Sequence, residues 1–196
     1  PIGILRDILE QDVGLRIFYL PLPAPFSEIY FYNETLGGCI AINSQHPEER
    51  NRWSLTHAFG HFLAHRHKPS VLKDNQRIPD SERFADRHTG FFLIPTSNLM
   101  RRFNDLVRAR ESGKLTQADL FSLAHYYGVS TPAIAIRLEG MKLIPSGTSD
   151  KFQARGMKLR DARTELGLEP LPTRGDKLPL RYQFLALEAL QQELIS

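Results

Sequence analysis

Apolar and polar positions along the chain follow two periods, and the change from one to the other marks the expected elements. Residues 2–11 place apolar side chains at helical spacing, which predicts a short amphipathic helix. Residues 15–20, 29–32 and 39–43 are short runs rich in β-branched and aromatic side chains, separated by a proline-rich stretch and a glycine turn. These runs predict three strands, which we expect to form a small, mostly antiparallel sheet.

From Pro47 onward the period becomes helical. Residues 68–79 contain two prolines and little apolar material, so they predict a surface loop. Residues 146–177 are rich in glycine, proline and charge without a clear period, and we expect an extended connection there. The ranges that predict helices are 47–67, 81–93, 98–110, 116–127, 132–139 and 180–194.

Together these elements predict an α+β fold in which the small sheet packs on a pair of helices and a helical C-terminal part follows. We expect a core over residues 1–95 and a helical lobe, similar in outline to a helix-turn-helix, over residues 96–145. Residues 146–196 would then form the extended connection and a last helix.

Composition narrows the class of protein. With 41% hydrophobic and 24% charged residues the chain has an ordinary globular make-up, which excludes collagenous, disordered and disulfide-scaffold proteins. Cys39 is the single cysteine and cannot form an internal disulfide, so we expect a reducing cytoplasm. No apolar run reaches the ~18 residues of a membrane span. The chain opens at Pro1 without a signal-peptide pattern, and we keep open that it is a piece of a longer protein.

The candidate chemistry lies in the helix predicted over residues 47–67. His57 and His61 are four residues apart, so both imidazoles lie on one helix face and can bind a single ion. A catalytic zinc site takes three protein ligands, often two histidines and a carboxylate. Glu82, at the start of the next predicted helix, is the best third candidate. Asp86, four residues later, is placed to accept a hydrogen bond from a ligand histidine.

Other polar residues are weaker candidates. Substitute ligands could come from His65 and His67, but surface positions fit them better, and His88 fits the lining of a cleft better than a ligand role. An oxyanion donor could come from His125, Tyr126 or Tyr127, although no spacing selects them and helix packing is the simpler role.

Three segments together resemble a known family. Residues 52–61 (RWSLTHAFGH), 82–86 (ERFAD) and 92–95 (FLIP) look like the motifs of the ImmA/IrrE family of zinc metallopeptidases, and the likeness covers roughly residues 1–145. Asp86 stands where the family commonly has asparagine, and His88 where it commonly has an aromatic residue.

The resemblance implies zinc bound by His57, His61 and Glu82. It also implies an intracellular protease that cuts a protein partner in a stress or phage-related response. That partner would be a transcriptional repressor of the XRE helix-turn-helix type, or an antitoxin-like protein.

Ala58 departs from the family pattern. In HExxH enzymes this position is a glutamate that takes a proton from the attacking water and passes it to the leaving amine. Alanine can do neither, so we expect the chain as written to be catalytically inactive while its metal ligands stay intact. Ala58 is either natural or an engineered replacement, and the intact remainder of the motif favours the second. The alternative function is a non-catalytic, zinc-containing sensor or partner-binding module.

The predicted lobe does not favour DNA binding. Reading base edges requires arginine, asparagine, glutamine or lysine at the front of the second helix, but residues 131–136 (TPAIAI) offer one hydroxyl and apolar side chains. The formal net charge of +3 is also small for a nucleic-acid-binding module. We therefore expect a structural lobe and no direct nucleic-acid contact. The arginines of the preceding helix predict a solvated face, with contact to an acidic partner as the alternative: Arg101, Arg102, Arg108 and Arg110.

Overall fold

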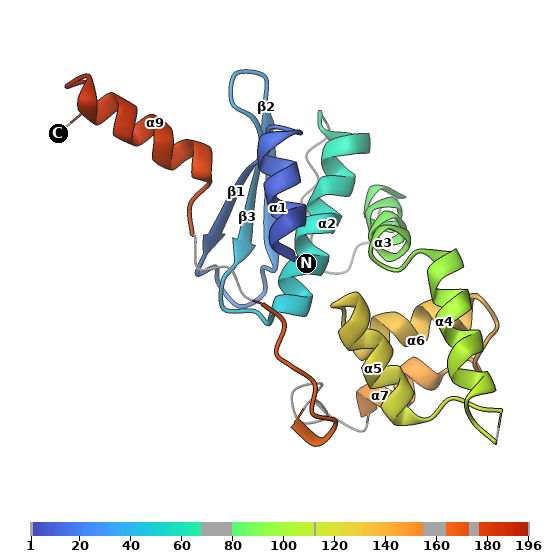
Figure 1. Ribbon diagram of the computed structural model, residues 1–196. Helices are drawn as coiled ribbons and strands as arrows, with labels where there is room; N and C mark the ends of the chain where they lie inside the picture. Colours follow the sequence, from blue (N-terminus) through green and yellow to red (C-terminus); the bar gives the residue numbers. More distant parts are fainter. Residues whose placement is uncertain (1, 68–79, 112, 155–163, 173–176, 196) are drawn as a thin grey trace. The chain divides into compact units, whose positions relative to one another are not determined.

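The computed structural model describes residues 2–67, 80–111, 113–154, 164–172 and 177–195 (Figure 1). The loop predicted over residues 68–79 lies outside these ranges. The chain divides into two compact units, residues 1–85 with 172–196 and residues 86–171. The domain boundaries expected at residues 95/96 and 145/146 stay a prediction. No helix in the described ranges is long and apolar enough to cross a membrane.

The α+β class is confirmed. In its described residues, the first unit contains three strands, three helices and the start of α3: α1 (Ile2–Gln11), β1 (Arg16–Leu20), β2 (Glu28–Asn33), β3 (Gly37–Asn43), α2 (Glu48–His65), the start of α3 (Asp80–Leu93) and α9 (Leu180–Gln191). The second unit is helical in its described part and contains the rest of α3, then α4 (Thr96–Arg108), α5 (Gln117–Tyr127), α6 (Thr131–Gly140) and α7 (Thr148–Ala154).

The sheet is mixed rather than mostly antiparallel. Its strand order is β1-β3-β2, with β3 antiparallel to β2 and parallel to β1. The turn after β2 is closed by Asn33, whose side-chain oxygen accepts the N–H groups of Thr35 and Leu36, so β2 and β3 form a hairpin. The proline-rich segment after β1 places β2 one strand position away from β1 in the sheet. β3 lies between them and pairs with both. The direction of β1 therefore depends on a non-local pairing that strand patterns do not reveal.

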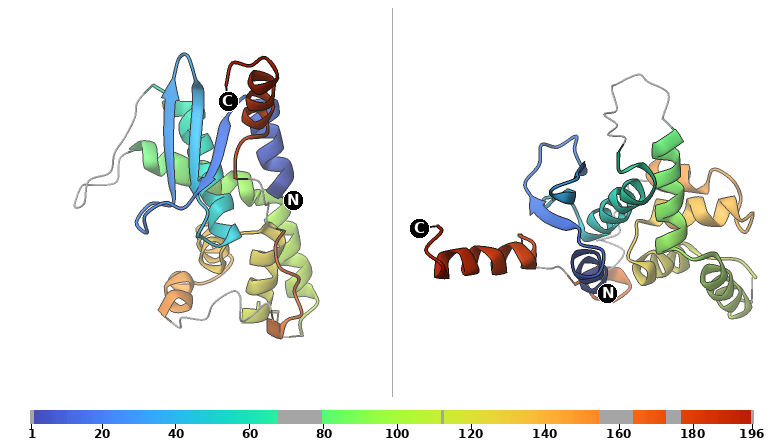
Figure 2. Two further views of the ribbon diagram at one scale, coloured as in Figure 1. Left: turned by 90° about the vertical axis from the view of Figure 1, so that its left-hand side faces the viewer. Right: turned by 90° about the horizontal axis from the view of Figure 1, so that it is seen from above.

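One face of the sheet forms the core of the first unit. Ile17, Ile40 and Ile42 are fully buried and pack with Leu9 of α1 and Leu55 of α2. Alternation along a strand places these isoleucines on the same face, so α1 and α2 cover one side of the sheet (Figure 2).

Gly38 on β3 lies under α2 with no room for a side chain. A Cβ atom there would lie 2.9 Å from the ring of Phe62 and would also overlap Leu15. Glycine at this position therefore sets how tightly α2, which carries both candidate histidines, packs on the sheet.

A buried ion pair fastens the C-terminal segment to the first unit. Arg6 of α1 is 1% exposed, and its guanidinium donates to the Glu10 carboxylate at 2.6 Å. The same group donates to the backbone carbonyls of Ile17 and Leu178, while Glu10 accepts the Leu180 N–H at the start of α9. The pair therefore joins α1, β1 and the residues before α9 within one unit.

Capping side chains and one glycine set the boundaries of two helices in the second unit. Thr116 caps α5 in a capping box with Asp119, Gly128 ends it in the left-handed conformation, and the Ser130 side chain caps α6.

The presence of α7 corrects the prediction of an extended connection over residues 146–177. Ser149 is buried, and its N–H donates to the Glu139 carboxylate of α6 at 2.7 Å. This contact with α6 stabilises α7, whose sequence is polar and has no clear hydrophobic period. Residues 155–163 and 173–176 of that predicted connection lie outside the described ranges.

Candidate metal centre

α2 presents its two histidines on one side of the helix. The ring centroids of His57 and His61 are 4.9 Å apart, as the i, i+4 spacing predicts. Leu55 and Ala58 of the same part of α2 belong to the core that packs on the sheet. These contacts fix the rotation of α2, so that both imidazoles lie beside the edge strand β2 and the start of α3.

Glu82, in the first turn of α3, completes a group of three. Its carboxylate oxygens lie 3.6 Å from Nε2 of His57 and 3.3 Å from Nε2 of His61. One donor atom from each residue lies within 4.8 Å of the other two. The structure thus brings together the three residues that the sequence singles out, and all three belong to the first unit.

The spacing of the donor atoms fits a zinc ion. Bonds of about 2.0 to 2.1 Å at tetrahedral angles separate two ligand atoms by roughly 3.3 Å, close to the distances from Glu82 to the two histidines. Burial lowers the pKa of His61, so its imidazole is neutral at pH 7, the form that binds metals. Two nitrogens and one carboxylate also match the ligand set of catalytic zinc sites.

Glu28 is a site residue that the sequence analysis did not identify. It is the first residue of β2, and its Oε1 lies 2.6 Å from Nδ1 of His57. Glu28 is a carboxylate partner for a candidate ligand histidine, the role predicted for Asp86. The available signal was the alternation of β2, which places Glu28 on the same strand face as Tyr30 and Tyr32.

Aromatic rings surround His61. The Tyr30 ring stacks on it at 6.3 Å between centroids, and the His65 ring lies 5.6 Å away. The Tyr30 hydroxyl is buried and has no hydrogen-bond partner in the described part of the chain. Burial raises the pKa of Tyr30 to about 12, so this hydroxyl stays protonated at neutral pH.

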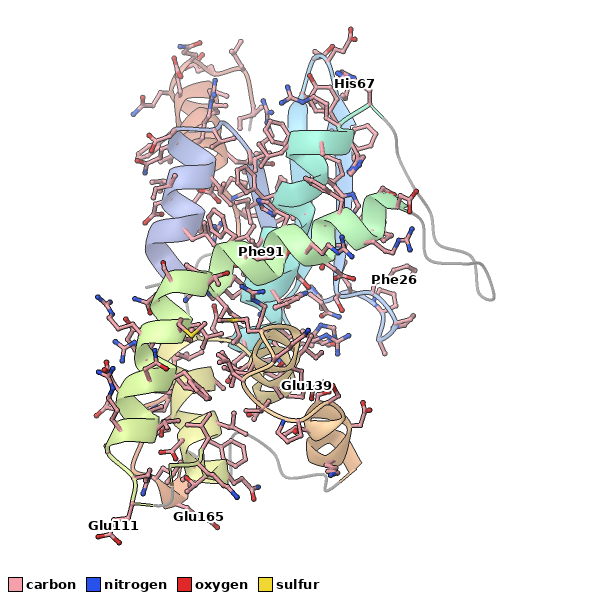
Figure 3. The ribbon with its side chains drawn as sticks, turned by 90° about the vertical axis from the view of Figure 1, so that its right-hand side faces the viewer. Phe26, His67, Phe91, Glu111, Glu139 and Glu165 are labelled. Carbon is pink, nitrogen blue, oxygen red and sulfur yellow. The ribbon has the colours of Figure 1, made fainter. Side chains whose placement is uncertain are left out.

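The remaining candidates are not among the three residues grouped in the described part of the chain. Asp86 is exposed one turn after Glu82, and its predicted role stays a prediction. His88 packs near Phe92, 5.6 Å between ring centroids, while His67, labelled in Figure 3, has its ring 5.0 Å from Tyr32. None of His65, His67 and His88 belongs to the metal-binding group found among the described residues.

The aromatic residues proposed as oxyanion donors lie in the second unit and take part in packing there. The Tyr127 hydroxyl donates to the Asn98 side chain at 2.5 Å, and the Arg102 guanidinium lies 3.3 Å from the Tyr126 ring centroid. These contacts agree with helix packing as the simpler role for both tyrosines.

Ala58 is 0% exposed and belongs to the core of the first unit. It follows His57 directly, so a longer polar side chain at this position would start beside the candidate metal ligands. Alanine offers no group that can accept or donate a proton.

Comparison with known proteins identifies the family of the chain. The model of the Peptidase_M78 family, described as an IrrE N-terminal-like domain, matches residues 10–139. This range covers about two thirds of the 196 residues and includes Glu28, His57, His61 and Glu82. No curated protein matches the chain.

Proposed function

The chain belongs to the Peptidase_M78 family of IrrE N-terminal-like domains, and from this premise we propose that it is a zinc metallopeptidase in which His57, His61 and Glu82 hold the metal. The observation that carries the proposal is the position of Glu82, whose two carboxylate oxygens face Nε2 of both histidines. The two helices meet at a spacing that suits one tetrahedral ion.

Each residue of the centre has a role in the proposed mechanism. A bound zinc ion would polarise the scissile carbonyl and favour ionisation of the attacking water. His57 and His61 supply neutral nitrogen donors, Glu82 supplies a negative charge, and the Glu28 carboxylate holds the His57 ring.

The missing step is proton transfer. Ala58 has no group to take the proton from water and deliver it to the leaving amine. A positioned general base typically contributes about 10²- to 10⁴-fold in rate. We therefore propose that the chain as written holds zinc and a protein partner but hydrolyses peptide bonds very slowly or not at all.

The proposed partner is a transcriptional repressor of the XRE type or an antitoxin-like protein, cut in the cytoplasm during a stress or phage-related response. This choice is what the resemblance to the ImmA/IrrE family implies. We do not propose direct contact with DNA. The front of α6 consists of Thr131 and small or apolar side chains, most of them buried in the second unit.

Restoring the base tests the proposal. Ala58→Glu should yield a protein that cleaves a repressor or antitoxin encoded beside its gene, and a chelator should abolish the cleavage. Ala64→Glu, an exposed position on the same helix, is the matched control and should leave cleavage absent. Elemental mass spectrometry should find one zinc per chain, lost in Glu82→Ala. A protein that holds no zinc, or an Ala58→Glu variant that holds zinc and cleaves none of these partners, contradicts the peptidase function.

The second candidate is a non-catalytic sensor or partner-binding module. Ala58 favours it, because an alanine at this buried position removes proton transfer without disturbing the three donor groups. Partner binding that persists in Ala58→Glu while cleavage stays absent would support this module over the peptidase.

A further inference from the structure

The two candidate histidines are held differently, and the difference lies in β2. His57 is hydrogen-bonded through Nδ1 to Glu28 at 2.6 Å, whereas His61 is buried against the Tyr30 ring. Glu28 and His57 are 29 positions apart in the chain, so their contact depends on the packing of β2 against α2. We propose that Glu28 is a positioning residue that fixes the ring orientation and tautomer of His57 and thereby sets the zinc affinity of the centre. This inference rests on the proposed metal ligands.

The hydrogen bond determines which nitrogen of His57 carries the proton. An ionised carboxylate only accepts hydrogen bonds, so the neutral imidazole facing it must donate from Nδ1. Nε2 is then left with its lone pair, and this atom faces Glu82 at 3.6 Å. Without Glu28 the proton is free to occupy Nε2, which would block the nitrogen that is needed for the metal.

The surroundings of the pair make the bond effective. The side chains of His57 and Glu28 are only 14% and 17% exposed, so water competes weakly for the carboxylate. A charge-assisted hydrogen bond in such a setting is short and strong. The ring of His57 is thus held from one side by the sheet and from the other by its own helix.

The backbone that carries Glu28 is itself anchored. Asn43, buried at the end of β3, donates its backbone N–H to the Ser27 carbonyl at 3.0 Å. Its side-chain amide donates to the carbonyls of Phe26 and Leu22. These bonds fix the residues just before Glu28, and Glu28 pairs with Ile42 in the sheet. The carboxylate is therefore presented from a fixed strand end rather than from a free loop.

Charge adds to the effect of geometry. Glu82 and Glu28 place two carboxylates on opposite nitrogens of one imidazole. Both would stabilise a divalent cation at the centre, Glu82 by direct contact and Glu28 through the ring. Removing outer partners of this kind typically lowers metal affinity by about 10- to 100-fold.

The test compares Glu28→Ala and Glu28→Gln with Glu34→Gln, an exposed glutamate in the turn after β2. Zinc dissociation constants are measured by competition with a chromophoric chelator. Glu28→Ala should weaken zinc binding about 10- to 100-fold at unchanged stoichiometry. Glu28→Gln, whose amide oxygen can still accept the bond, should fall between Glu28→Ala and the original chain, and Glu34→Gln should match the original chain.

A second measurement does not depend on the metal. Nitrogen-15 NMR of the metal-free protein should show His57 protonated at Nδ1, and this tautomer should lose its dominance in Glu28→Ala. An unchanged zinc affinity together with an unchanged tautomer in Glu28→Ala would overturn the inference. If the original chain takes up no zinc, the proposed function fails, while the tautomer measurement still decides whether Glu28 orients His57. Circular dichroism of each variant reports whether it has folded.

Discussion

Replacing Arg6 tests how the C-terminal segment is held. The guanidinium is 1% exposed, donates to Glu10, Ile17 and Leu178, and lies 5.0 Å from the centroid of the Tyr19 ring. Arg6→Ala removes the cation and leaves the Glu10 carboxylate, whose side chain is 5% exposed, buried without its counter-charge. Desolvation of that carboxylate is no longer offset by the charge that faced it.

The expected loss of stability follows from the burial of the pair. Breaking a buried ion pair by removing one partner costs about 3 to 5 kcal/mol. For a chain of this size each kcal/mol shifts the melting temperature by about 2 to 4 °C, so Arg6→Ala should melt roughly 6 to 20 °C lower. The double variant Arg6→Met with Glu10→Met should recover much of this loss, because it leaves no unpaired charge in the core.

Thermal unfolding followed by circular dichroism measures these differences. Limited proteolysis gives a second readout, since Arg6→Ala should release the segment around α9 sooner. Arg181→Ala, an exposed arginine on α9, is the control and should change stability by less than about 0.5 kcal/mol. If Arg6→Ala lowers the free energy of unfolding by less than about 1 kcal/mol, the reasoning is refuted, because breaking a buried ion pair should destabilise the protein more than that.

Three further substitutions test the packing that supports the two units. Gly38→Ala should lower stability by about 1 to 3 kcal/mol, because the added methyl would lie 2.9 Å from the Phe62 ring. The control is Gly140→Ala, whose added methyl meets no atom within 4 Å and should not destabilise the chain. Equal losses of stability in both variants would contradict the close approach of α2 to Gly38. Leu55→Ala should cost about 2 to 5 kcal/mol in urea unfolding, because the Leu55 side chain of α2 is fully buried in the core of the first unit, and a loss below 1 kcal/mol would show that the core there is loose. Asp119→Asn should cost about 1 to 2 kcal/mol at pH 7, because it removes the negative charge that strengthens the capping box and the bond from Arg110. Burial alone would raise the pKa of Asp119, but the hydrogen bonds from Arg110 and Thr116 hold it below its ordinary value. The stability advantage over Asp119→Asn should therefore be complete above about pH 4 and disappear as the pH falls through the lowered pKa, and a difference independent of pH would contradict this origin.

The sequence predicts those features of the fold that depend on neighbours along the chain. The helical period locates α2, and the i, i+4 spacing places His57 and His61 on one side of it. Thr116 and Ser130 mark the starts of α5 and α6 because a cap acts on the first turn of its own helix. These local rules are sufficient wherever the partner atoms lie within one or two turns.

The sequence misses the features that depend on distant partners. Two examples are the parallel pairing of β1 with β3 and the hydrogen bond from α7 to Glu139. In both cases the sequence patterns of the two segments do not indicate that they are in contact. Glu28 is the instructive case. A solvent-exposed glutamate on a strand would give the same sequence pattern. Only the packing of β2 against α2 brings the Glu28 carboxylate to His57.

The position of Ala58 explains how metal binding and hydrolysis can separate in this chain. Its side chain is fully buried, and alanine is the residue that a helix accommodates most readily. His57 is held by the helix and by Glu28, His61 lies on the same helix, and Glu82 comes from α3, so none of these contacts involves the side chain at position 58. The proposed metal centre can therefore stay intact while the proposed proton-transfer step is lost. Zinc content and cleavage must then be measured separately, because zinc content alone cannot report whether the proposed base is present.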